Sequence, residues 1–309
     1  MFKRLILSLL LVIILVLVGC TTGATEKSSL KIGSLPRIFD MIAYAAQQEG
    51  LFKEQGIDVE IVSFRSTLEM NSALLAGELD GIIGDVFLVV NLNLEGETAK
   101  LVGCSVMPRM FEIVASPESD ITCPADLRGK EIATGAGTIM DYALDRLLLA
   151  EGLNPDDIVK VNVPNMPLRV EMVNQGKVPA AILTPPLSDL IVLNGGKVII
   201  DDLEEPFAGP GLTFSLKALK HKSNAIGKFI QAWQQAVEMI NANPGKYQGL
   251  LNKVAFVPES VSLDVPAFPK LVLPPEAQVA TVVNWFMDNG LMDKPAAYEE
   301  VVDTSYLTK

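Results

Sequence analysis

The sequence predicts an α/β protein with two similar lobes, each a sheet flanked by helices. Short apolar runs typical of strands alternate with segments that carry one apolar helical stripe. The order strand, helix, strand, helix, strand occurs twice along the chain, and this alternation is typical of sheets with helices on both faces. About 280 residues follow the amino-terminal segment, which is enough for two lobes.

The first unit is expected to begin with a strand over 30–34 and a helix over 37–48. Alternating apolar residues predict a second strand over 59–64, followed by a helix through Met70 and a third strand over 81–84. The second unit repeats this order without repeating the sequence. Its expected elements are strands at 131–135, 159–163 and 180–184 and helices at 142–150 and 168–175.

The last third of the chain is expected to be mostly helical. One apolar stripe includes Phe229 and Trp233, and another includes Val279 and Phe286, so both predict core contacts. Between them, the segment 258–275 contains five prolines. It is expected to be an extended surface connection with a structural role.

The amino terminus has the pattern of a secretion signal. Lys3 and Arg4 precede an apolar run over 5–18, which is shorter than the roughly 20 residues that span a bilayer. The sequence Leu-Val-Gly-Cys that ends at Cys20 resembles the lipobox of bacterial lipoproteins. That resemblance implies a signal peptide over 1–19 and acylation of Cys20, for example by palmitate, which anchors the protein outside the cytoplasm on the bacterial cell membrane. An ordinary signal with an incidental cysteine is the alternative.

A flexible tether is expected over 20–29, because these residues are small and polar and have little to bury. The folded part then begins near Leu30.

Composition excludes nucleic acid as a partner. The chain has 25 basic and 37 acidic residues and a formal net charge of −12. No cysteine and histidine pattern with metal-ligand spacing occurs, so we expect neither a metal site nor a cofactor. Cys104 and Cys123 are expected to be buried free thiols, because the predicted fold places them in different lobes.

Two turns from a strand into a helix carry the helix-start pattern Ser/Thr-x-x-Glu/Asp. They begin at Ser66 and Thr138, and the second follows a glycine-rich turn. A helix amino terminus offers free N–H groups and a partial positive charge, which suits an anionic or polar ligand. Such turns also occur simply as caps, and that alternative stays open. One turn in each lobe, facing a shared cleft, favours binding.

Several segments together carry a family resemblance that covers nearly the whole mature chain. They occur in the order 49–53 (EGLFK), 56–59 (GIDV), 73–81 (ALLAGELDG), 125–130 (ADLRGK), 241–244 (NANP) and 302–307 (VDTSYL). The sequence resembles the substrate-binding proteins of nitrate, sulfonate, taurine and thiamine-precursor importers. The resemblance implies a type II periplasmic-binding-protein fold with a hinge, and an ABC permease and ATPase as partners. It places one lobe at 30–110 and 209–309, and the other lobe at 111–208.

The resemblance also implies which residues line the ligand cleft between the lobes. They are Leu35, Pro36, Arg37, Phe39, Asp40, Ser66, Thr67, Gly84, Asp85, Met107, Arg109, Gly135, Gly137, Thr138, Asp141, Thr184 and Pro185.

The charges in this set suggest the ligand, which we expect to be a small polar organic molecule. Arg37 and Arg109 can clamp a carboxylate or sulfonate, because a guanidinium offers paired donors. Asp40, Asp85 and Asp141 can instead bind amino groups of a zwitterion or heterocycle, such as a thiamine-precursor pyrimidine. Asp85 departs from the small or apolar residue found in much of the family, and every one of these charges can also be solvated at the cleft rim.

Catalysis is not expected, although the fold also hosts enzymes and the sequence resembles the pyrimidine synthases that make the thiamine precursor. His221 is the only histidine, and its position between two lysines predicts that it is exposed. Without a second histidine or a suitable cysteine, acyl transfer and zinc hydrolysis lack their residues. A mechanism that uses carboxylates alone and a lipoprotein that senses or scaffolds are the remaining alternatives.

Overall fold

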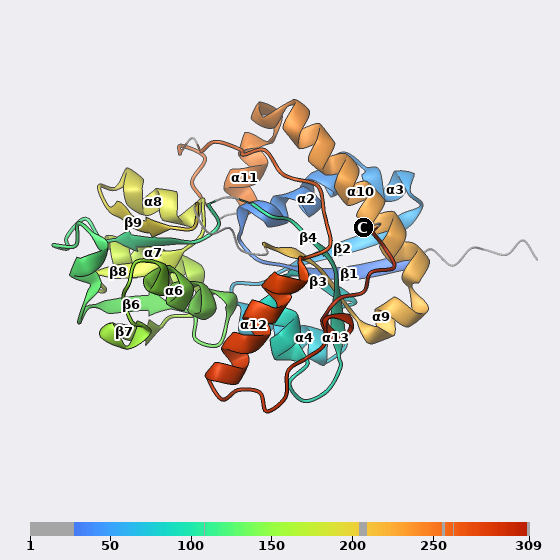
Figure 1. Cartoon of the computed structure of the whole chain (residues 1–309). Helices are drawn as coiled ribbons and strands as arrows, with labels where there is room; N and C mark the ends of the chain where they lie inside the picture. Colours follow the sequence, from blue (N-terminus) through green and yellow to red (C-terminus); the bar gives the residue numbers. More distant parts are fainter. Residues whose placement is uncertain (1–27, 108, 204–208, 255–256, 262, 308–309) are drawn as a thin grey trace, which may run out of the picture.

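A computed structural model describes residues 28–107, 109–203, 209–254, 257–261 and 263–307 of the 309. The expected signal peptide, Cys20 and most of the tether lie outside these residues. Figure 1 shows two groups of strands and helices side by side, and the long helix α10 (Ser223–Ala242) packs on the larger group. None of the helices in this described part is long and apolar enough to cross a membrane.

The first sheet has the strand order β2-β1-β3-β10-β4. β1 pairs in parallel with β2 and β3, and β10 pairs antiparallel with β3 and β4. Its strands are β1 (Ser28–Ser34), β2 (Ile57–Ser63), β3 (Gly81–Gly84), β4 (Ala99–Cys104) and β10 (Gly211–Ser215).

The second sheet repeats this arrangement with the order β7-β6-β8-β5-β9. β6 pairs in parallel with β7 and β8, and β5 is the antiparallel strand in the fourth position. Its strands are β5 (Glu112–Ala115), β6 (Glu131–Thr134), β7 (Val159–Asn162), β8 (Ala180–Leu183) and β9 (Lys197–Asp201).

The chain therefore passes between the sheets twice, from β4 to β5 and from β9 to β10. The strands expected at 30–34, 59–64, 81–84 and at the three places in the second unit are all present, within one or two residues. The sequence pattern did not indicate β5, β9 and β10, which are only four or five residues long.

The helices cover the faces and ends of the two sheets. The α-helices are α2 (Met41–Gln48), α3 (Leu51–Glu54), α4 (Thr67–Leu75), α5 (Val86–Leu92), α6 (Ile139–Ala150), α7 (Met166–Asn174), α8 (Leu187–Leu193), α9 (Leu216–His221), α10, α11 (Gln248–Val254), α12 (Glu276–Asp288) and α13 (Tyr298–Val301). Short 3-10 turns are η1 (Ile38–Asp40), η2 (Pro124–Leu127), η3 (Pro155–Asp157) and η4 (Pro244–Tyr247).

Aromatic side chains from α10 form the centre of one core region. Phe229 and Trp233 are fully buried, as their stripe predicts. Trp233 packs on Phe39, with ring centroids 5.2 Å apart, and Phe268 contacts the same ring edge-on. Phe268 lies in the proline-rich segment 258–275, which has no helix or strand among its described residues. The connection lacks regular secondary structure, but it does not lie wholly on the surface as expected, because Leu263, Phe268 and Leu271 are buried and anchor it to the core.

The cysteines differ from the prediction in one respect. Cys104 and Cys123 are both free thiols, and Cys104 is buried in β4. Cys123 is exposed, because it lies in the loop just before η2 and not in the core of a sheet. His221 is exposed at the end of α9, as predicted.

Candidate functional site

A pocket of about 120 Å³ lies between the two sheets and takes its lining from both. Most of its residues follow strands or begin helices, which is where open α/β sheets bind ligands. The first lobe contributes Leu35, Arg37, Thr67, Leu68, Asn71 and Asn91, and the second lobe contributes Gly135, Ala136, Gly137, Thr138, Ile139, Met140, Asn162, Pro164, Met166 and Arg169. We call this cavity the interlobe pocket.

The loop after β1 is held by a buried ion pair. Nε of Arg37 donates to Oδ2 of Asp40 at 2.8 Å, and its Nη2 donates to the carbonyl of Ile83 at 2.6 Å. The other oxygen of Asp40 accepts the N–H of Leu35. Burial raises the pKa of Asp40, and the charge of Arg37 opposes that shift. Arg37 lines the pocket with its charge already balanced, and Asp40 lies beneath the surface with no exposed area.

Helix caps terminate two further loops of the first lobe. Ser66 caps α4 by accepting the N–H of Glu69 at 3.3 Å, as predicted. Asp85 caps α5 by accepting the N–H of Leu88 at 2.8 Å. Burial raises the pKa of Asp85 as well. The carboxylate of Asp85 therefore acts as the N-cap of α5, and this structural role explains why an acid occupies the position.

The facing loop of the second lobe is built from backbone and glycine. Thr138 caps α6 by accepting the N–H of Met140, and its hydroxyl donates to the carbonyl of Gly135 at 2.6 Å. Gly137 has φ +67°, a left-handed conformation that other residues rarely adopt. Asn162 accepts the N–H of Ala136 at 3.0 Å. The loop is more exposed than its counterpart, because Ala136 and Gly137 both face solvent.

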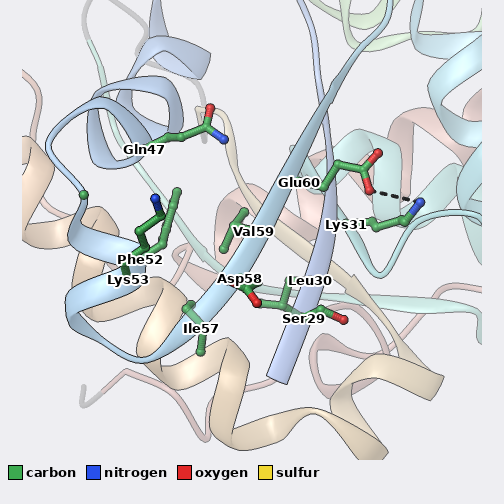
Figure 2. A pocket seen from close by; sticks show the side chains of 11 residues that line it. Ser29, Leu30, Lys31, Gln47, Phe52, Lys53, Ile57, Asp58, Val59 and Glu60 are labelled. Carbon is green, nitrogen blue, oxygen red and sulfur yellow. Dashed lines mark ion pairs between the residues drawn. The ribbon is translucent and has the colours of Figure 1, made fainter. Parts of the chain in front are cut away.

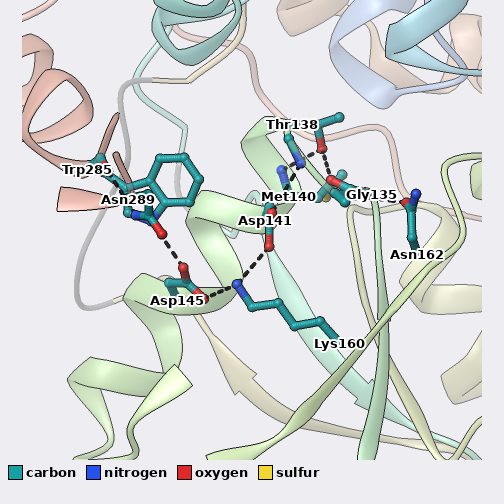
Figure 3. A network of polar contacts seen from close by, with 11 residues as sticks. Gly135, Thr138, Met140, Asp141, Asp145, Lys160, Asn162, Trp285 and Asn289 are labelled. Atoms are coloured by element: carbon teal, nitrogen blue, oxygen red, sulfur yellow. Dashed lines mark hydrogen bonds and ion pairs between the residues drawn. The ribbon is translucent and has the colours of Figure 1, made fainter. Parts of the chain in front are cut away.

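A polar network continues from this loop into the first lobe (Figure 3). Asp141 accepts the N–H of Gly137, and Nζ of Lys160 contacts Asp141 at 2.8 Å and Asp145 at 2.5 Å. Trp285 of α12 donates from its indole nitrogen to Asp145 at 3.1 Å. Burial lowers the pKa of Lys160, but its hydrogen bonds to the two carboxylates outweigh that effect and raise it. The network ties α12 to the helix that begins at the pocket.

A second contact between the lobes lies at the pocket itself. The side-chain amide of Asn91, on α5, donates to the carbonyl of Gly137 at 3.1 Å. Phe87 of the same helix packs on Tyr142 and Trp285, with centroids 6.0 and 5.2 Å apart. These contacts hold the two walls of the interlobe pocket together.

Arg169 is the most buried charged residue of the pocket lining, with 1% of its surface exposed. Its guanidinium donates to the carbonyl of Val163 from Nε and Nη2, at 3.0 and 2.8 Å, and from Nη1 to the carbonyl of Ile182 at 2.8 Å. It forms no ion pair with any described residue. Burial lowers the pKa of Arg169 to about 10, so the side chain stays charged at neutral pH.

A second, smaller cavity adjoins the first through Arg37. Its lining includes Phe39, Met107, Arg109, Thr184 and Pro185. Arg109 donates to Glu112 and, at 2.7 Å, to Asp189, and these two carboxylates raise its pKa although burial opposes them. Like Arg37, Arg109 has its charge balanced within the protein.

A profile of the family described as NMT1/THI5 like matches residues 40–247, which is more than half of the chain. The chain belongs to the NMT1/THI5-like family. A putative thiamine biosynthesis protein of Haemophilus influenzae is 27% identical over 140 residues. The match covers 45% of this chain and 45% of that relative, so the chain spans less than half the length of the curated relative that it matches.

Solved structures show the fold of this NMT1/THI5-like protein. The alkanesulfonate-binding protein SsuA from Xanthomonas axonopodis pv. citri, bound to MOPS, has a TM-score of 0.78 and 20% identity, covering 91% of this chain and 99% of that chain. The desulfurization enzyme DSZB has a TM-score of 0.69 and 14% identity, covering 91% and 97%. The predicted two-lobed periplasmic-binding-protein fold of type II is confirmed.

The predicted cleft residues of this family member separate into three groups. Leu35, Arg37, Thr67, Gly135, Gly137 and Thr138 meet in the interlobe pocket. Arg37, Phe39, Met107, Arg109, Thr184 and Pro185 meet in the adjoining cavity. Pro36, Asp40, Ser66, Gly84, Asp85 and Asp141 line neither cavity.

Sequence reasoning missed the polar lining residues Asn71, Asn91, Asn162 and Arg169. Asn162 ends β7, so the position of ligand sites at strand ends was a usable signal. Arg169 and Asn71 lie inside helices, and only the tertiary structure turns them toward the pocket.

A further cavity of about 340 Å³ lies at the opposite end of the first sheet (Figure 2). Its lining includes Leu30 and Ile57, where β1 and β2 begin, and Phe52 of α3. Lys31 and Glu60 form an exposed ion pair at 3.0 Å beside it. Since ligand sites of such sheets lie at the carboxyl ends of strands, this cavity is separate from the interlobe pocket.

Proposed function

We propose that this protein is an extracytoplasmic solute-binding lipoprotein of an ABC importer, which captures a small polar organic molecule of the sulfonate or carboxylate type between its lobes. The main support for the proposal is the interlobe pocket, which takes its lining from both lobes and mostly from the turns where strands lead into helices. The binding residues we propose are the predicted cleft residues together with Asn71, Asn91, Asn162 and Arg169.

The two crossovers suit a hinge. We assign one lobe to 30–110 and 209–309 and the other to 111–208, so two chain segments join them. A ligand that contacts both lobes favours their closed arrangement, since it has more contacts there. An importer can then distinguish loaded from empty protein by shape.

Membrane attachment through Cys20 is the second part of the proposal. It rests on the lipobox-like sequence and on the leader before it. Acylation at that position keeps the binding protein beside its permease and ATPase partners on the outer side of the cell membrane.

The composition of the pocket lining favours binding over catalysis. The described lining residues include no cysteine, histidine, aspartate or glutamate, which are the usual nucleophiles and proton carriers. Cys104 lies in a buried strand, and burial raises the pKa of its thiol to about 12. An enzyme of the pyrimidine synthase or desulfurization type is therefore the weaker alternative.

A thiamine-precursor pyrimidine is the second ligand class to test, because the Haemophilus influenzae relative is described as a putative thiamine biosynthesis protein. The three asparagine side chains of the pocket can pair with the ring nitrogens and amino group of a pyrimidine.

A thermal-shift screen tests the proposed function. The full-length protein in detergent is heated with sulfonates, carboxylates, pyrimidines and amino acids. A ligand present at 100 times its dissociation constant is expected to stabilise the protein by about 2.7 kcal/mol and to raise its melting temperature. An unchanged melting temperature across the whole panel contradicts the proposal.

A further inference from the structure

We propose that Arg169 is the counter-ion of the ligand and selects small organic molecules with a single negative charge and a hydroxyl or amino donor. This inference rests on the proposed solute-binding function and specifies its ligand. The resemblance pointed instead to Arg37 and Arg109 as the anion clamp.

The two charged residues of the pocket lining differ in their partners, and this difference points to Arg169. Arg37 and Arg169 are the only charged residues of the lining among those described. The charge of Arg37 is neutralised by Asp40 at 2.8 Å, whereas Arg169 has carbonyl partners only. Arg169 is therefore the one charged side chain of the described lining that has no carboxylate partner, and it has almost no contact with water.

A buried charge without a counter-ion is costly even after the protein has relaxed around it. Carbonyl oxygens offset part of that cost, and an anion beside the guanidinium offsets more of it. One positive charge matches one negative charge. A dianion would leave a net negative charge in the pocket, and a cation would be repelled.

The geometry leaves donors for such an anion. A guanidinium has five N–H groups, and the three carbonyl bonds of Arg169 leave one on Nη1 and one on Nη2. Gly135 keeps the approach to Nη2 open, because a Cβ at that position would lie 3.1 Å from it. A carboxylate or sulfonate can accept from both terminal nitrogens.

The opposite wall offers an acceptor. Oδ1 of Asn71, on α4 of the first lobe, is buried and has no hydrogen-bond partner among the described residues. A buried acceptor without a partner destabilises the protein, and a hydroxyl or amino donor of the ligand removes that cost. The anionic end of the ligand then contacts the second lobe, and its donor contacts the first.

A series of compounds that share a hydroxyethyl group and differ in charge tests this assignment. Binding of 2-hydroxyethanesulfonate, 3-hydroxypropanoate, 2-hydroxyethyl phosphate and choline to the full-length protein is measured by calorimetry at pH 8, where the phosphate is doubly charged. We expect at least one of the two monoanions to bind at least tenfold more tightly than the phosphate, and choline not to bind. The affinities of 2-hydroxyethanesulfonate and 3-hydroxypropanoate show whether the site prefers a sulfonate or a carboxylate.

Variants then assign the effect to Arg169. Arg169→Gln is expected to lower affinity for the preferred monoanion about tenfold to a hundredfold, as for a charged hydrogen bond, and Arg169→Lys is expected to lower it less. Arg128→Gln is the matched control, since it removes the same charge from an exposed ion pair with Asp157 and should leave affinity unchanged. If Arg169→Gln does not fold, Gly135→Ala replaces it, and its added methyl group should weaken binding by blocking Nη2.

Unchanged affinity in a folded Arg169→Gln protein overturns the assignment, and so does unchanged affinity in Gly135→Ala when Arg169→Gln fails to fold. Tighter binding of the phosphate or of choline overturns the choice of a monoanion. A wild-type protein that binds a pyrimidine or an amino acid but neither monoanion refutes this inference and leaves the solute-binding function intact. A wild-type protein that binds nothing in either panel counts against the proposed function itself.

Discussion

The loops that follow the equivalent strands β1 and β6 line the same pocket, but they are stabilised in opposite ways. The first loop is fixed by charged side chains, with Arg37 and Asp40 paired beneath the surface. The second is fixed by backbone hydrogen bonds and a threonine cap, and its residues Ala136 and Gly137 are open to solvent. In the first wall the charge of Arg37 is therefore already paired with a carboxylate. In the second wall two N–H groups of Arg169 remain available to a ligand.

The largest expected effect concerns the buried pair. Asp40→Ala leaves the guanidinium of Arg37 buried without its carboxylate, and we expect it to lower the free energy of unfolding by about 3–5 kcal/mol. Asp141→Ala in the second loop is the comparison, because Lys160 keeps Asp145 as its partner and the expected loss is about 1 kcal/mol or less. Urea denaturation measures both. Equal losses would mean that the two loops do not differ in the way described.

The next effect concerns Asp202, a buried carboxylate that forms no ion pair with any residue the structure describes. Asp202 is fully buried and accepts the N–H groups of Met110 and Phe111, so it joins the two crossovers. Burial raises the pKa of Asp202 from 3.8 to about 6. The folded state then binds this proton more tightly than the unfolded state, so the stabilisation is complete below pH 3.8 and is lost as the pH rises through 6.

Asp202→Asn keeps the acceptor oxygen and removes the titration. At 1.36 kcal/mol per pH unit, the wild type is expected to gain at most about 3 kcal/mol more than the variant between pH 7.5 and pH 4. Urea unfolding midpoints of both proteins across this range measure the difference. Parallel pH profiles for the two proteins would exclude Asp202 as the titrating group.

The helix caps give the smallest effect. Ser66→Ala and Thr138→Ala are each expected to cost about 1 kcal/mol of stability. Thr138→Ala should cost more, because the threonine hydroxyl also donates to Gly135 whereas Ser66 only accepts from Glu69. The melting temperatures of the two single variants show which substitution destabilises the protein more. A larger loss for Ser66→Ala would contradict the reliance of the second loop on its cap.

Much of the fold followed from the sequence, because its parallel strands and amphipathic helices have strong periodic patterns. The strands over 30–34 and 131–135 and the stripe of α10 are examples. The antiparallel strands β5 and β10 were not apparent, since each takes its place beside partners far away in the chain and lies outside the repeated strand-and-helix pattern.

The site was predictable where it depends on local turns and not where it depends on charge balance. Thr138 and Gly135 follow a strand and precede a helix, and this pattern is visible in the sequence. The pairing of Arg37 with Asp40 could also be suspected from their spacing of three residues. Two properties come from the folded chain alone: Arg109 pairs with Asp189, eighty residues away, and Arg169 pairs with no carboxylate of the described residues.

The position of β10 has a consequence for how the protein is made. All five strands of the second sheet lie within 112–201, so that sheet can assemble as soon as this stretch has left the ribosome. The first sheet lacks the strand between β3 and β4 until residue 215 has been synthesised. Pairings between distant segments form slowly, and domains tend to fold as units in the order in which they are completed. The lobe that begins first along the chain is therefore expected to be the last to finish folding.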